Sequence, residues 1–128
     1  MKSLDEQFAD VLRTYAGASL MAMGNGVHQV LIPGVLLPAG WNQATTEVRF
    51  VVPAGYPYAA PDCFWADPSL RLQNGSMPQN AQIGQPNPGQ PDPGKLWFSW
   101  HLQAPWNPSN CSLTTYVNVI RRRFEAAQ

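Results

Sequence analysis

The chain begins with an amphipathic pattern that is typical of a helix. Apolar residues recur at helical spacing on one face of residues 4–16, which predicts a first helix there. Ser3 and Glu6 have the spacing of a capping box, in which each side chain accepts a hydrogen bond from a free backbone N–H at the helix start. Gly17 follows this helix, and glycine adopts the left-handed conformation that ends many helices without a steric penalty.

The pattern then changes to the shorter period of β-strands. Three apolar segments, separated by turns of Gly, Pro and Asn, span residues 19–23, 27–37 and 45–52. Such short turns favour antiparallel neighbours. With a fourth apolar run from Cys63 to Ala66, the segments predict a four-stranded antiparallel meander.

The second half of the chain predicts a long loop and another helix. Residues 73–94 are rich in Gly, Pro, Asn and Gln and have no periodicity, which is typical of a surface loop. Apolar residues return at helical spacing over residues 112–126, which predicts a second helix. Three arginines lie near its end, where cations interact favourably with the helix dipole. The order of elements predicts a single α+β domain over residues 1–128.

Composition then narrows the possible functions. The 128 residues suffice for one domain, and eight Lys and Arg balance eight Asp and Glu. A neutral chain offers no positive field to nucleic acid or an anionic membrane, so neither is expected as a partner. The apolar run at 30–41 is interrupted by Pro and Gly and is shorter than the roughly 20 residues of a membrane span. The charged start lacks an apolar signal core, so we expect a soluble cytoplasmic protein.

The cysteines and histidines do not indicate a metal site. Cys63 and Cys111 are expected to be free thiols, because isolated pairs in proteins that are not exported are seldom disulfides. The two histidines are also scattered, so no metal or other cofactor is expected. Cys63 lies in a predicted strand and is expected to belong to the core, which leaves it out of the candidate site.

Two short motifs lie between the predicted elements. Residues 55–62 contain two prolines and two tyrosines. The fixed φ angles of the prolines make this reversal of the chain rigid, and it is either a functional hinge or a stiff connector. An aromatic segment at 96–101 precedes a Trp-x-Pro motif. The residues that define the two motifs are Tyr56, Pro57, Pro61, Trp106 and Pro108.

This order of helix, meander, Tyr-Pro-x-x-x-Pro, long loop, Trp-x-Pro and helix resembles the ubiquitin-conjugating (UBC) fold. The stretches 62–65 and 97–101 are most similar to a bacterial branch of that superfamily, of the prokaryotic family E type. The resemblance implies an enzyme that takes the activated C-terminus of a ubiquitin-like protein from an activating enzyme, holds it as a covalent ester and passes it to an amine. It also implies that the activating enzyme docks on the first helix and nearby loops, and that the gene lies in a defence or stress operon.

The resemblance places the nucleophile on the loop that leads to Trp-x-Pro, where eukaryotic enzymes have a cysteine. This chain has none there, and Ser99 is the sole side-chain nucleophile between Lys95 and Trp106. We therefore expect Ser99 to form an oxyester, unless it is only a surface hydroxyl. His101 shares a face with Ser99 if the segment is extended, so it either takes the hydroxyl proton or hydrogen-bonds the loop.

Other residues remain candidates. Cys111 is the rival nucleophile, because the N-terminus of the helix that follows it lowers a thiol pKa; otherwise it is a half-buried cysteine at a helix cap. Family members polarise the carbonyl with the Asn of a His-Pro-Asn phrase, which is missing here, and either Asn80 or Asn87 could substitute. This departure supports a second hypothesis, a catalytically inactive UBC-fold module that binds a ubiquitin-like protein or the activating enzyme.

The tryptophans support a third hypothesis. Trp97, Trp100 and Trp106 beside a polar loop could stack against a sugar or a peptide, although dense aromatic residues in a small sheet more often form core. In an extended segment the odd-numbered residues from 97 to 102 face one way and the even-numbered residues the other. At least one of the two sets is therefore expected to be buried.

Overall fold

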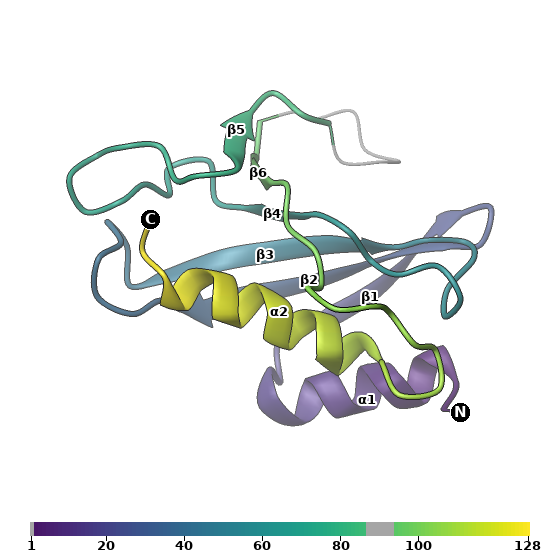
Figure 1. The fold of residues 1–128 in the computed structure, drawn as a ribbon. Coiled ribbons are helices and arrows are strands. Elements are labelled where there is room, and N and C mark those ends of the chain that lie inside the picture. The colour runs from purple at the N-terminus through teal and green to yellow at the C-terminus, as the bar shows by residue number, and fades with distance from the viewer. Residues whose placement is uncertain (1, 87–93) are drawn as a thin grey trace.

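The computed structural model describes residues 2–86 and 94–128, and within them six strands form one antiparallel sheet with two helices on one of its faces (Figure 1). The strand order is β1-β2-β3-β4-β6-β5. In chain order the elements are α1 (Leu4–Thr14), β1 (Ser19–Gly24), β2 (Val27–Leu36), β3 (Thr45–Val52), β4 (Phe64–Ala66), β5 (Ala81–Ile83), β6 (Leu96–Phe98) and α2 (Leu113–Glu125). The predicted α+β fold, with a helix before and after the sheet, is confirmed.

α1 begins as its capping box predicts. The Ser3 N–H donates to Glu6 Oε1 at 3.0 Å, and the Glu6 N–H donates to Ser3 Oγ at 3.2 Å. The helix ends two residues early, at Thr14, and the expectation that Gly17 takes a left-handed conformation is wrong. A Cβ on Gly17 would lie 3.2 Å from Pro33 Cγ, so this glycine permits close packing against β2 instead.

The predicted meander is present as β1 to β4, and the sheet continues with two strands that the sequence pattern did not predict. β5 lies inside the segment 73–94 that was predicted to be a loop, and β6 lies in the aromatic segment after it. Each has three residues, too few for an alternating pattern to be recognised. Residues 87–93 of the predicted loop lie outside the described residues.

The core lies between the helices and the face of the sheet that they cover, which we call the inner face. Alternate residues of β3 from Thr46 to Val52 are buried there, while the residues between them are less buried. Phe64 of β4 and Phe98 of β6 stack at 4.7 Å between ring centroids, and Phe124 of α2 packs edge-on against both. α2 therefore holds β4 and β6 together.

Residues of the two sequence motifs join α1, the proline-rich turn and the start of α2. Gln7 of α1 is buried, and its Oε1 accepts hydrogen bonds from the Tyr56 hydroxyl and the Leu113 N–H. The Trp106 Nε1–H donates to the Pro57 carbonyl at 2.7 Å, and the Trp106 ring packs against Tyr56. Both motifs thus help to fix α2 relative to α1.

Candidate active site

Ser99 directly follows β6, at a point where the pairing with both neighbouring strands continues. β4 and β6 pair Phe64 with Phe98, so one further step of this antiparallel register puts Cys63 opposite Ser99. On the β5 side, the Ser99 N–H donates to the Asn80 carbonyl at 2.8 Å, which extends the β5–β6 register by one residue. The backbone of half-buried Ser99 is therefore held at the end of the sheet.

Alternate residues of this segment face opposite sides of the sheet, as predicted. Phe98 is buried, and Trp100 and Leu102 pack against the same core. Trp97 is the register partner of Trp65 and lies with it on the outer face, away from the helices. The even-numbered set therefore faces the core as expected, but only Phe98 is buried, and Trp100 and Leu102 are half-buried.

α2 holds the residue after Ser99. The Tyr116 hydroxyl donates to the Trp100 carbonyl at 2.9 Å, and the Tyr116 side chain is buried. Burial raises the pKa of Tyr116, so the hydroxyl keeps its proton and remains a donor at physiological pH. Hydrogen bonds with Asn80 and Tyr116 therefore fix the backbone on either side of the Ser99 side chain.

His101 lies beside a carboxylate that the sequence pattern did not single out. Its Nδ1 is 3.7 Å from Oδ1 of Asp62, and the two side chains are 63% and 75% exposed. Within the described residues, no hydrogen bond joins the Ser99 hydroxyl to the His101 imidazole. A hydrogen bond between His101 and Ser99 therefore requires a rotation of a side chain. The exposure of the His101 side chain permits such a rotation.

Cys63 is not a core residue, and that expectation is wrong. β4 begins one residue later, and Cys63 is a half-buried free thiol that lines a cavity of about 320 Å³ with Asp62 and Trp97. Burial and the charge of Asp62 raise the pKa of the Cys63 thiol, and the neighbouring Trp97 side chain and Trp100 backbone oppose this rise without reversing it. The Cys63 thiol is therefore protonated near pH 7.

The remaining candidates lie in different places. Asn80 is next to Ser99 and has a φ of 60°, a left-handed conformation that asparagine tolerates better than most residues. Asn87 is outside the described residues. Cys111 lines a separate hollow with Lys2 and Asp10 near the start of α2. The structure thus brings Asn80 and Cys63 to Ser99, but not Cys111.

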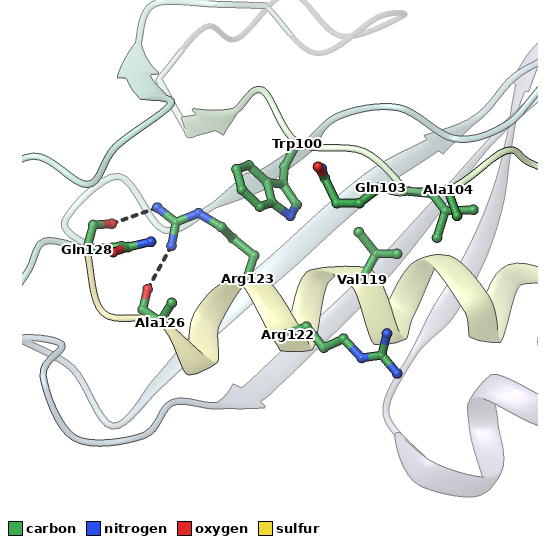
Figure 2. Close-up of a pocket in the computed structure, with 9 residues that line it drawn as sticks. Trp100, Gln103, Ala104, Val119, Arg122, Arg123, Ala126 and Gln128 are labelled. Atoms are coloured by element: carbon green, nitrogen blue, oxygen red, sulfur yellow. Dashed lines mark hydrogen bonds between the residues drawn. The ribbon is translucent and has the colours of Figure 1, made fainter.

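The three clustered tryptophans of the sequence do not form one platform. Trp97 lines the Cys63 cavity on the outer face, and Trp106 packs against Tyr56. Trp100 lines a different cavity, of about 290 Å³, between the segment 100–104 and the second half of α2 (Figure 2). Nothing in this separation favours one extended stacking surface for a sugar or a peptide.

Arg123 dominates the cavity that Trp100 lines (Figure 2). Its buried guanidinium donates to the backbone carbonyls of Gln79, Ala126 and Gln128. It also lies 5.2 to 5.8 Å from the centroids of three aromatic rings, those of Trp41, Phe98 and Trp100. These contacts join the end of α2 to the neighbouring loops, which is a structural role.

The segments that meet at the end of β4 and β6 carry a thiol, an imidazole and a carboxylate, groups that suit acyl and proton transfer. Across residues 2–86 and 94–128, no three His, Cys, Asp or Glu side chains are grouped so that they could hold a metal ion. Across the same ranges, no helix is both long and apolar enough to span a membrane.

One comparison with known proteins identifies a family for this chain. Neither the curated proteins nor the solved structures give a match. A family model described as prokaryotic E2 family E matches residues 11–127. The matched range includes the whole described sheet, both sequence motifs, Ser99 and α2. The chain therefore belongs to the prokaryotic E2 family E, a family of proteins similar to ubiquitin-conjugating enzymes.

Proposed function

We propose that this protein is the conjugating enzyme of a bacterial ubiquitin-like modification pathway, and that Ser99 accepts the acyl group of the ubiquitin-like C-terminus. The observation that carries the proposal is the setting of Ser99, a half-buried hydroxyl at the end of β6 whose flanking backbone is hydrogen-bonded to Asn80 and Tyr116. Family membership supports the conjugating role in general. The partners are then an activating enzyme and a ubiquitin-like protein.

The proposed transfer begins with a thioester carried by the activating enzyme. Ser99 Oγ attacks the thioester carbonyl carbon while its proton passes to the imidazole of His101. The C–S bond breaks with its electron pair on sulfur, and the imidazolium gives the proton to this thiolate. An oxyester on Ser99 and a free thiol on the activating enzyme result. An amine later attacks the oxyester, the C–O bond breaks, and Ser99 regains a proton.

Such a site has to stabilise the developing oxyanion more than a cysteine enzyme does, because an oxyester is less reactive than a thioester. We assign this role to Asn80. Its backbone carbonyl accepts a hydrogen bond from the Ser99 N–H, so Asn80 lies next to the proposed nucleophile. A side-chain amide N–H is the donor type that stabilises oxyanions in acyl transfer.

The experiment incubates the full chain with its activating enzyme, the ubiquitin-like protein and ATP, and resolves covalent adducts on denaturing gels. We expect an adduct that survives a reducing agent and is cleaved by hydroxylamine or alkali, because it is an oxyester. Ser99→Ala abolishes it, and Ser99→Cys converts it to an adduct that thiols release. Ser76→Ala is the matched control, because Ser76 is exposed and belongs to a different loop.

Other outcomes contradict the assignment of Ser99. An adduct that thiols release from the wild-type protein, and that is lost in Cys63→Ala or Cys111→Ala, identifies that cysteine as the nucleophile. An oxyester that persists in Ser99→Ala excludes Ser99 equally. Both cysteines are free, so each can be replaced without breaking a disulfide.

One observation favours a second candidate function, a catalytically inactive module that binds the ubiquitin-like protein or the activating enzyme. The Ser99 hydroxyl and the His101 imidazole are not hydrogen-bonded to each other in the described part of the chain. A serine hydroxyl without a base in contact keeps its proton and is a weak nucleophile. Binding of either partner in isothermal titration calorimetry, together with no adduct under any condition, identifies this function.

A further inference from the structure

We propose that Asp62 is a positioning residue for His101: its carboxylate holds the Nδ1–H of the imidazole, so that Nε2 is left free to take the proton of Ser99. The inference rests on the proposed function of Ser99. The contact that suggests it is the 3.7 Å separation between Asp62 Oδ1 and His101 Nδ1. A carboxylate on Nδ1 is the arrangement that fixes the tautomer and orientation of a general-base histidine beside a serine nucleophile.

The sheet explains why these residues meet. β4 and β6 are antiparallel, with Trp65 opposite Trp97, so the residues just before β4 lie beside the residues just after β6. The Ser99 N–H donates to the Asn80 carbonyl at 2.8 Å, which attaches the segment after β6 to the residue before β5. The hydrogen bond from Tyr116 to the Trp100 carbonyl adds a third attachment, to α2. The backbones next to Asp62 and His101 are therefore fixed.

The side chains, in contrast, are free to close the remaining distance. They are 75% exposed for Asp62 and 63% exposed for His101, and 3.7 Å exceeds a hydrogen bond by less than one ångström. A small rotation of either side chain is enough. Hydrogen bonds between catalytic groups are often long before the substrate is bound and shorten in the reacting complex.

The charge distribution around this pair favours the same arrangement. Among the described residues, Asp62 is the one charged group within ion-pair distance of His101. The neighbouring titratable groups are Cys63 and Tyr116, and burial raises the pKa of both, so they are uncharged near neutral pH. The carboxylate of Asp62 is thus the described charge that can stabilise an imidazolium formed when His101 takes the Ser99 proton.

The first measurement reads the tautomer of His101 directly. Long-range ¹H–¹⁵N correlation spectra of the free protein, at about pH 8 where an ordinary imidazole is neutral, identify which nitrogen carries the proton. We expect the Nδ1–H tautomer in the wild-type protein, a shift toward Nε2–H in Asp62→Ala, and restoration in Asp62→Glu. Glu125→Ala is the matched control, because Glu125 is an exposed carboxylate at the end of α2.

The second experiment measures the rate of oxyester formation on Ser99 as a function of the concentration of activating enzyme that carries the ubiquitin-like protein as a thioester. Asp62→Ala is expected to lower the maximal rate of oxyester formation by about 10- to 100-fold. The concentration of activating enzyme that gives half of this rate should not change, and Asp62→Glu should restore part of the rate. Because the Asp62 side chain is exposed, its replacement is not expected to unfold the protein, and backbone amide spectra check this.

The outcomes separate this inference from the proposed function. If the wild-type protein forms no oxyester, the proposed function fails, and this inference fails with it. If the oxyester forms and the maximal rate of Asp62→Ala equals that of the wild type, only the inference fails. A lower rate with an unchanged His101 tautomer also overturns it, because Asp62 then acts on the structure or on partner binding.

Discussion

Gln7 shows how one buried polar side chain can connect three elements. Its Oε1 accepts hydrogen bonds from the Tyr56 hydroxyl in the proline-rich turn and from the Leu113 N–H at the start of α2, and its Nε2 donates to the Lys2 carbonyl. The N–H groups in the first turn of a helix have no partner within the helix. Gln7 supplies one for α2, and at the same time fixes the position of the Tyr56 ring.

Replacing Gln7 with methionine therefore leaves the buried Leu113 N–H and the half-buried Tyr56 hydroxyl without their acceptor. We expect Gln7→Met to lower the free energy of unfolding by about 1–3 kcal/mol, the usual cost of burying an unpaired polar group. Chemical denaturation measures the difference. Gln73→Met is the matched control, because Gln73 is exposed and should change the stability little. Equal effects of the two substitutions would mean that the Gln7 hydrogen bonds do not contribute.

Individual residues also mark where the sequence predicts the candidate site and where it does not. Ser99 and His101 follow from a resemblance in the order of motifs, which stays the basis of their assignment. Asp62 and Cys63 were missed, because their proximity to Ser99 depends on the pairing of β4 with β6. A run of apolar residues suggested that Cys63 is core, yet the strand starts just after it. The signal that could have found Asp62 is its place two residues before the start of that strand.

Among the elements, the helices and the longer strands follow from the sequence, and the short strands do not. A capping box and helical spacing predict α1, and alternation over eight residues predicts β3. β5 and β6 have three residues each and exist through their pairing with each other and with β4. Such strands depend on contacts between distant segments, which a local pattern does not contain.

An ion-pair cluster on the outer face links strands that are not direct neighbours. Oε1 of Glu47 in β3 lies 2.6 Å from Arg49 Nε and 3.2 Å from Lys95 Nζ. Lys95 directly precedes β6, and β4 lies between β3 and β6 in the sheet. Burial opposes the ionised form of Glu47, but the hydrogen bonds from Arg49 and Lys95 outweigh it and lower the pKa of this carboxyl. The cluster therefore stabilises the ionised form in the folded protein.

The sign of this shift predicts a pH dependence. A carboxyl whose pKa is lowered by folding stabilises the protein above its ordinary pKa of about 4.3, and this contribution is lost as the pH falls through the lowered value. We expect Glu47→Gln to lower the free energy of unfolding at pH 7 by at most about 1 kcal/mol, and to be neutral at about pH 2.5. Urea denaturation at both pH values measures this, with Glu125→Gln as control. A difference that persists in acid would exclude the ion pairs as its cause.

For the molecule as a whole, the fold and the family are established, and the chemistry is the part that needs testing. The sheet, α1 and α2 form the E2-like scaffold that the family match over residues 11–127 indicates. In the proposed mechanism, this scaffold holds a serine at the end of β6. A separate thiol lies opposite it at Cys63, with its pKa raised by burial. Ser99, Cys63 and Cys111 are the nucleophiles among which an experiment has to decide.

The most direct test maps the covalent adduct on the wild-type protein. The protein that carries the covalent adduct is digested under acidic, non-reducing conditions that preserve esters. Tandem mass spectrometry then locates the residue that carries the C-terminal remnant of the ubiquitin-like protein. We predict that the remnant is on Ser99 and that alkali removes it. A remnant on Cys63 or Cys111, or complete charging with unmodified Ser99, would contradict the account.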